Sequence, residues 1–180
     1  MKNIIIAAGY ATRLYPLTEN FPKPLLKVGD RNILERMLDD IDPFPEIDSH
    51  IIVTNHKFTP IFQEWLKTTS YEKPVTIIDD GTTSNDKRLG AVRDLLLVIK
   101  DCNINDDIMV LAADNILEFS LRGFIDYFNE KGTSVIMCHH EPELKRLQRT
   151  GVIAVNDEMK VLEMQEKPET PVSNWAVPPF

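Results

Sequence analysis

The sequence has few cysteines and no long apolar run. Its two cysteines, Cys102 and Cys138, form no C-x-x-C pair, so neither a disulfide framework nor a zinc site can be built from them. No apolar run approaches the roughly 18 residues of a membrane-spanning helix, and no basic region followed by a long apolar stretch opens the chain. We therefore expect no membrane partner and a cytoplasmic location.

Basic residues are too few for general nucleic-acid binding. The chain carries 20 Lys and Arg against 28 Asp and Glu, a net charge of −8, whereas a nucleic-acid surface needs a basic stripe. We expect no nucleic-acid partner. Positive charge is local to the first thirty positions, where basic side chains outnumber acidic ones: Lys2, Arg13, Lys23 and Lys27 against Glu19 and Asp30.

The remaining composition is that of an ordinary globular protein. Apolar residues make up 43% of the 180 and charged residues 27%, and a chain of this length buries roughly 70% of its unfolded surface as one domain. No internal repeat, coiled-coil heptad or low-complexity tract is present. We therefore predict a single domain over residues 1–180.

The stretch from Ile4 to Val28 carries the strongest chemical signal. The β-branched run that ends at Ala8 predicts a strand buried on both faces, and Gly9 after it lets backbone N–H groups turn toward an anion. Arg13 can fork across two phosphate oxygens, and Lys23, between two prolines, supplies a point charge. These features predict a polyphosphate loop, with an ordinary turn carrying two surface cations as the alternative.

The order G-Y-A-T-R-L-Y-P-L-T-x-x-x-P-K-P-L-L resembles the signature of the sugar-1-phosphate nucleotidyltransferases, G-x-G-T-R-L-x-P-x-T-x-x-x-P-K-x-L. The resemblance implies that Arg13 and Lys23 are catalytic. Ala11 replaces the second glycine of the signature, which is tolerated if its φ is negative. The resemblance also implies that the loop binds the nucleotide through Ala8, Gly9, Tyr10, Ala11 and Thr12.

Strand and helix patterns alternate along the chain. This rhythm predicts an α/β, Rossmann-like fold with a central, mainly parallel twisted sheet flanked by helices. Further strands are predicted at His50–Thr54, Val75–Ile78, Asp107–Asp114, Thr133–Cys138, Thr150–Asn156 and Lys160–Pro168, and helices after Asn32, from Thr59-Pro60, from Arg88 and after Ser120.

Asp114 ends one of these predicted strands. Ligands collect at the carboxyl ends of strands in open α/β sheets, so a carboxylate at this point is well placed to meet one. The segment resembles the family's V-L-x-G-D-N strand, with Ala113 in place of the glycine, which implies that Asp114 binds Mg²⁺ and that Asn115 reaches the sugar or the waters of the metal. The alternative is a strand-end Asp that caps a turn.

The loop from Asp79 leads into a helix that starts near Arg88. In the resembled family the equivalent segment lies against the nucleotide base, which implies that Leu89 and Gly90 bind the nucleotide. Small residues also let a helix pack closely on a sheet, and this alternative stays open.

The last part of the chain resembles two further family elements, Y-G-V … E-K-P and S-N-x-A. They imply that Gly151, Glu166, Lys167 and Asn174 bind the sugar and its phosphate. Family members usually extend further and supply a second metal-binding aspartate, so the resemblance also implies a domain that is C-terminally incomplete.

Three functions follow from this reading. The first is Mg²⁺-dependent transfer of a nucleoside monophosphate from an NTP to a sugar 1-phosphate, giving an NDP-sugar and pyrophosphate. The second is a CTP-dependent cytidylyltransferase acting on phosphocholine or another phospho-alcohol. The third is a catalytically silent regulatory domain that binds a nucleotide or sugar phosphate. The base, the sugar and assembly into a homo-oligomer stay open.

Overall fold

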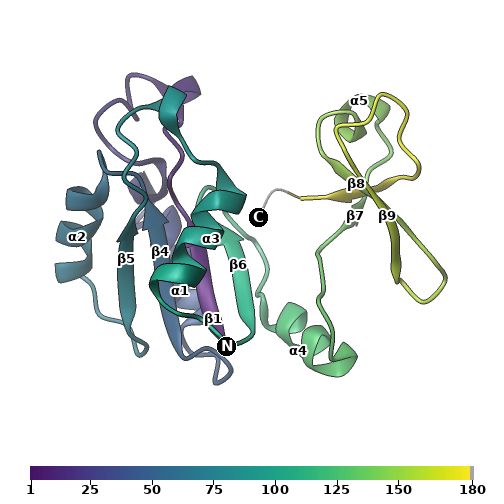
Figure 1. Ribbon diagram of the computed structural model, residues 1–180, viewed down its shortest axis with the longest axis horizontal. Helices are drawn as coiled ribbons and strands as arrows, with labels where there is room; N and C mark the ends of the chain where they lie inside the picture. The colour runs from purple at the N-terminus through teal and green to yellow at the C-terminus, as the bar shows by residue number, and fades with distance from the viewer. Residues whose placement is uncertain (179–180) are drawn as a thin grey trace. The chain divides into compact units, whose positions relative to one another are not determined.

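The computed structural model describes residues 1–178, which form two compact units, residues 1–122 and the part that begins at Gly123. Figure 1 shows a parallel sheet with helices in the first unit and a smaller antiparallel sheet in the second. The prediction that the 180 residues form one domain stays a prediction. No helix of the described residues is both long enough and apolar enough to span a membrane.

The first unit is organised around a four-stranded parallel sheet in the order β5-β4-β1-β6. Ile4 and Ile5 of β1 are fully buried, which confirms the prediction of a strand covered on both faces. Edge strand β6 is more open, with Val110 38% exposed. The strands span Lys2–Ile6 (β1), Ser49–Thr54 (β4), Val75–Asp79 (β5) and Ile108–Ala112 (β6), and a small hairpin pairs Lys27–Val28 (β2) with Arg31–Asn32 (β3).

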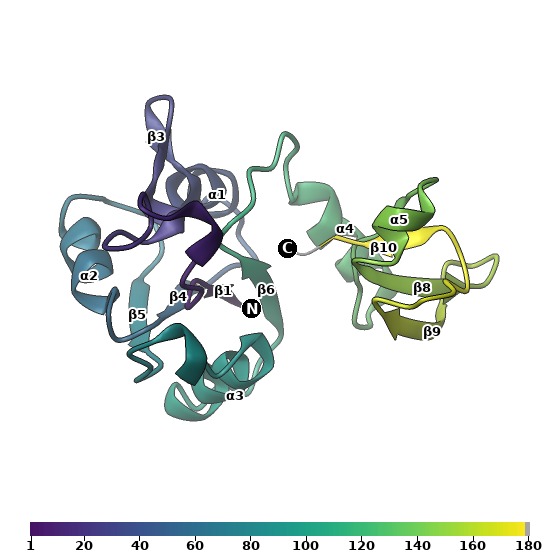
Figure 2. The same cartoon turned by 90° about the horizontal axis from the view of Figure 1, so that it is seen from above.

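Helices α1 and α3 cover opposite faces of this sheet (Figure 2). Asn32 caps α1 as predicted, in a capping box with Glu35. The N-cap of α2 is Phe58, one residue before the predicted Thr59, and Asn55 Oδ1 accepts the Phe58 N–H at 3.0 Å. The helices span Ile33–Ile41 (α1), Thr59–Lys67 (α2), Ala91–Asp101 (α3) and Arg122–Lys131 (α4), with short 3₁₀ turns at Thr12–Leu14 (η1), Lys23–Leu25 (η2) and Asn85–Lys87 (η3).

The strand order reverses beside β1. The chain passes from β1 to β4 and then to β5 on one side, and returns to place β6 on the other side of β1. Ligands of open α/β sheets bind in the crevice outside the carboxyl ends of the strands at such a switch point. The topology therefore predicts a ligand site at the segments that follow β1 and β6.

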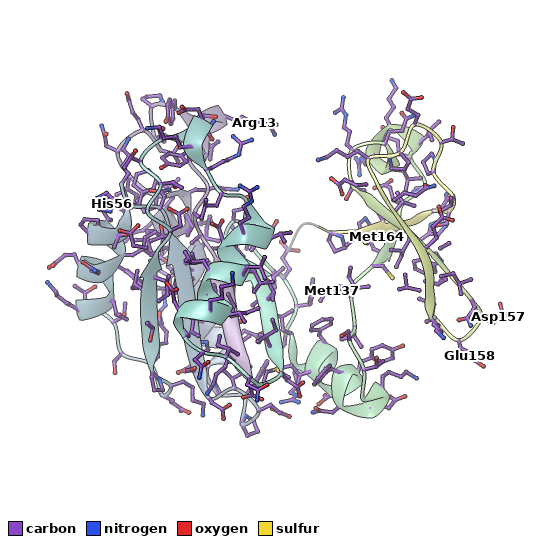
Figure 3. All side chains as sticks on the ribbon, in the orientation of Figure 1. Arg13, His56, Met137, Asp157, Glu158 and Met164 are labelled. Carbon is purple, nitrogen blue, oxygen red and sulfur yellow. The ribbon has the colours of Figure 1, made fainter. Side chains whose placement is uncertain are left out.

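The second unit carries a four-stranded sheet in the order β7-β10-β8-β9, with antiparallel pairing. Asp157 and Glu158 lie at the tip of the β8–β9 hairpin (Figure 3). The predicted strand Thr133–Cys138 is wrong: residues 134–138 are irregular, because pairing with the short β10 reaches only His139 and His140. The elements span His139–His140 (β7), Leu144–Leu147 (α5), Gly151–Val155 (β8), Val161–Glu166 (β9) and Trp175–Val177 (β10).

Candidate functional site

Lys23 and Asp114, 91 positions apart in sequence, meet at the switch point. Lys23 Nζ donates to the backbone oxygen of Asp114 at 2.9 Å and to its Oδ2 at 3.0 Å. Lys23 opens the η2 turn between two prolines, and Asp114 follows β6, so both side chains are positioned by segments at the carboxyl edge of the sheet. The structure thus brings together the predicted catalytic cation and the predicted metal ligand.

The surroundings of Asp114 suit a hydrated cation. Its side chain is 53% exposed, and Asn115 Nδ2 donates to its Oδ1 at 3.0 Å. Among residues 1–178 no cluster of three or more His, Cys, Asp or Glu side chains is arranged for a metal. Mg²⁺ usually takes one or two carboxylates and completes its shell with water and phosphate oxygens, so a single accessible Asp114 fits this ion.

The loop after β1 is held in place by hydrogen bonds within the loop and to the segments that follow β4 and β5. Thr18 Oγ1 donates to the carbonyl of Ala11 at 2.8 Å, and Asn55 Nδ2, from the end of β4, donates to the carbonyl of Ala8 at 3.1 Å. Tyr10 Oη donates to the carbonyl of Thr82, in the loop after β5, at 2.9 Å. The carbonyls of Ala8 and Ala11 are therefore satisfied within the protein, and both anchoring side chains, Thr18 and Asn55, are fully buried.

Two small residues of this loop, Ala11 and Gly9, differ in backbone conformation and in the space around them. Ala11 has φ 46° and ψ 40°, so the condition of a negative φ is not met and an alanine occupies a left-handed conformation that favours glycine. Gly9 is exposed, and a Cβ built on it would meet no atom of residues 1–178 within 4 Å. The space above Gly9 is therefore open to a ligand that approaches the backbone.

Arg13 lies in the η1 turn of the same loop, on the first unit (Figure 3). Its side chain is exposed, and within residues 1–178 it makes no hydrogen bond or ion pair. Lys23 is bound to Asp114, whereas the guanidinium of Arg13 has no partner in the described part of the chain and can bind an anion.

The segment predicted to face the base forms the start of α3. Gly90 is the N-cap, with φ 88° and ψ 154°, a backbone region that essentially only glycine enters. Leu89 beside it is half-buried. The Tyr10–Thr82 hydrogen bond joins the β5–α3 loop, which contains Leu89 and Gly90, to the loop after β1.

Two desolvated carboxyl groups lie near this segment. Asp94, in the first turn of α3, is only 3% exposed, and burial, with a smaller contribution from Asp80, raises the pKa of its carboxyl to about 6. Burial also raises the pKa of Asp80, whose Oδ1 accepts the Thr82 N–H and hydroxyl at 2.7 Å each. Asp94 Oδ1, by contrast, has no hydrogen-bond partner among the described residues.

The predicted sugar-phosphate residues beyond Asn115 lie in the second unit. Gly151 in β8 pairs with Glu166 in β9, and Lys167 follows with its N–H donating to Thr150 at 3.1 Å. Lys167 Nζ forms an ion pair with Glu166 Oε1 at 2.8 Å. Asn174 precedes β10, and its carbonyl accepts the N–H of Glu141 at 2.8 Å. Gly151, Glu166 and Lys167 are therefore neighbours in the second unit, and their binding of a sugar phosphate stays a prediction.

Sequence reasoning missed the residues that support the site. Thr18 stands in the recognised motif without an assigned role, and Asn55 follows a predicted strand at its carboxyl end, which was an available signal. Asp94 lies four residues before Val98 on the apolar face of a predicted helix. A charged residue on an apolar helix face is unusual, and this was a second available signal. The bond from Asn55 to Ala8 could not be predicted from sequence, because 47 positions separate the two residues, and the lack of a partner for Asp94 Oδ1 within residues 1–178 depends on packing.

A parallel α/β sheet whose switch point carries a glycine loop, a lysine and an aspartate is the architecture of a phosphate-ligand-binding protein. The chain belongs to the nucleotidyl transferase family, whose model matches residues 2–178.

Two curated relatives illustrate the range of the family. The chain is 33% identical over 175 residues to the bifunctional protein GlmU of Methanococcus aeolicus, covering 97% of this chain and 38% of the relative. It is 28% identical over 180 residues to the UTP–glucose-1-phosphate uridylyltransferase AglF of Haloferax volcanii, covering 100% of this chain and 70% of the relative. The chain thus spans well under half of the first relative.

The fold matches solved structures. A UDP-glucose pyrophosphorylase complexed with UDP-glucose superposes with a TM-score of 0.77 at 20% identity, covering 98% of this chain and 73% of that chain. The apo form of a UDP-glucose pyrophosphorylase gives a TM-score of 0.80 at 19% identity, covering 99% and 74%. These likenesses confirm the α/β fold with its central parallel sheet.

Proposed function

We propose that this chain transfers a nucleoside monophosphate from an NTP to a sugar 1-phosphate, with Mg²⁺, releasing pyrophosphate. The observation that carries the proposal is the Lys23–Asp114 pair, bonded at 2.9 and 3.0 Å at the switch point of the sheet, in a chain that belongs to the nucleotidyl transferase family. The NTP and sugar phosphate are metabolites of the cytoplasm, which supports a cytoplasmic location.

The reaction needs alignment and charge neutralisation. An oxygen of the sugar phosphate attacks the α-phosphorus in line, and the α–β phosphoanhydride bond breaks as the new P–O bond forms. The attacking phosphate is already ionised, so no protein base is required. Mg²⁺ held by Asp114 would neutralise phosphate charge when bound.

The protein's own cations divide the remaining charge. Arg13, exposed and unpaired among residues 1–178, binds the departing pyrophosphate. Lys23 Nζ has three N–H donors and donates two hydrogen bonds to Asp114, so one donor remains for the α-phosphoryl oxygens. In the second unit Glu166 accepts hydrogen bonds from sugar hydroxyls, and Lys167 neutralises the attacking phosphate. Gly151 and Asn174 belong to the same subsite of the second unit.

The first test uses nucleotide binding and then turnover. Thermal unfolding with Mg²⁺ and each common NTP identifies the nucleotide, because a ligand at a hundred times its Kd adds about 2.7 kcal/mol. Pyrophosphate release with a panel of sugar 1-phosphates then measures turnover. We expect Lys23→Ala to lower the rate by about 10²-fold or more, since one preorganised charge is lost from the transition state.

Lys27→Ala is the matched control, because Lys27 is an exposed lysine on the nearby β2. It should leave turnover unchanged. A Lys23→Ala rate within a few-fold of the parent would contradict the role of Lys23. The absence of any thermal shift with all NTPs, in a chain that unfolds cooperatively, would contradict the nucleotide site itself.

A further inference from the structure

We propose that Asp94 is the base-reading residue of the nucleotide site and selects guanine by accepting hydrogen bonds from its N1–H and 2-amino group. The inference rests on the proposed function and names its nucleotide.

Asp94 lies in the first turn of α3, on the face of the helix that packs on the sheet. It precedes Val98 by one helical turn and so shares its face of α3. Val98 is fully buried in a cluster with Ile4 and Val53 of the sheet. Because α3 starts at the end of the β5 loop, its first turn lies at the edge where the loops after β1 and β5 meet through the Tyr10–Thr82 hydrogen bond.

The carboxyl group of Asp94 has an open acceptor. Only 3% of the residue is exposed, and Oδ1 has no partner within residues 1–178. A buried polar atom without a partner destabilises a protein, and such atoms are rare in native folds. The backbone N–H of Asp94 bonds to the Gly90 carbonyl at 3.0 Å, but the side-chain Oδ1 accepts no hydrogen bond within residues 1–178. A ligand donor would satisfy it.

The charge around Asp94 determines which part of a nucleotide fits. Asp80 lies close enough to act on it electrostatically, and Asp79 precedes Asp80 at the end of β5. Carboxylates repel a phosphate, and the cationic Arg13 lies in the segment after β1. The base, as the neutral end of the nucleotide, is therefore the part that Asp94 meets.

Hydrogen-bond chemistry then separates the bases. The two oxygens of a carboxylate match two adjacent donors, which guanine presents at N1–H and its 2-amino group. Uracil and thymine offer one N–H between two carbonyls, which a carboxylate repels. Adenine and cytosine offer one amine beside an acceptor nitrogen. AglF is named a uridylyltransferase, but 28% identity does not carry its base to this chain.

The test measures the Kd of nucleoside triphosphates with Mg²⁺ by calorimetry on the parent chain and on Asp94→Asn. We expect the parent to bind GTP at least 10-fold more tightly than UTP, and about 10-fold more tightly than ITP, which lacks the 2-amino group. Asp94→Asn should weaken GTP by 10- to 100-fold and tighten XTP by about 10-fold, because the amide donates to the 2-carbonyl of xanthine while its oxygen accepts N1–H.

Asp101→Asn, an exposed position on the same helix, is the matched control and should change no Kd. Gain of XTP binding by Asp94→Asn requires a folded variant and so separates recognition from loss of structure. If the parent prefers an NTP other than GTP, and if Asp94→Asn binds that NTP with the same Kd as the parent, the base-reading role is overturned and the proposed function stands. A parent that binds no NTP overturns both.

Discussion

At the scale of single residues, Asp94 shows a conflict between stability and ligand recognition. Its carboxyl is buried, and its pKa is raised to about 6 from an ordinary 3.8. A carboxyl whose pKa is higher in the folded state than in the unfolded state binds its proton more tightly when folded, so ionisation destabilises the fold. The free energy of unfolding therefore falls as pH rises between about 4 and 6, and the loss remains above that range.

We expect Asp94→Asn to unfold at a higher temperature than the parent at pH 8. The gain should be about 2 to 3 kcal/mol at most, by the size of the pKa shift, and should vanish below about pH 4, where Asp94 is protonated in both states. Thermal unfolding of both chains from pH 4 to 8 measures the difference, in which the titration of other groups largely cancels. The same substitution removes the electrostatic repulsion between residue 94 and Asp80, since asparagine carries no charge. A difference that does not change with pH would refute this account.

At the scale of elements, the loop after β1 is anchored through two backbone carbonyls and is uncovered at Gly9. Thr18 and Asn55 bind two of its carbonyls, whereas a Cβ on Gly9 would lie more than 4 Å from every other described atom. The sequence motif identified this loop because its residues are contiguous. It did not reveal that Ala11 adopts φ 46°, since the conformation of one residue depends on the bond from Thr18 and on the turn that follows.

Ala11→Gly should stabilise the protein. An alanine in the left-handed region costs about 1 to 2 kcal/mol, and the extra freedom of glycine in the unfolded chain offsets about 0.4 to 1 kcal/mol of the gain. We therefore expect a net increase of about 0.5 to 1 kcal/mol, seen as a small rise in Tm. Ala112→Gly, at an extended position in β6, is the control and should lower Tm. A lower Tm for Ala11→Gly would show that the loop adopts another conformation in solution.

At the scale of the whole molecule, the candidate residues divide between the two units. Arg13, Lys23 and Asp114 belong to the first unit, and Gly151 and Glu166 to the second. Each unit has its own sheet, and the helix α4 spans the boundary. The proposed nucleotide and sugar-phosphate subsites are therefore carried by separately packed parts of one chain.

Hydrogen exchange should distinguish the ligands by unit. We expect an NTP with Mg²⁺ to slow amide exchange in residues 7–18 and 80–94 of the first unit. An NDP-sugar should slow exchange in the same segments and also around β8 and β9, because we propose that Gly151 and Glu166 bind its sugar. Peptide-resolved mass spectrometry against the unliganded chain measures both. Protection by an NDP-sugar confined to the first unit would contradict the sugar-phosphate assignment.

The sequence by itself determined the alternation of strands and helices, the position of the loop after β1 and the residues that carry charge, because these depend on local patterns and on a contiguous motif. The tertiary structure decided the strand order that places β6 beside β1, the pairing of Lys23 with Asp114 across 91 positions, and the burial of Asp94 without a partner. These arise from packing between distant segments. A side chain's pKa and its open hydrogen-bond capacity depend on what surrounds it in space, which its neighbours in sequence do not specify.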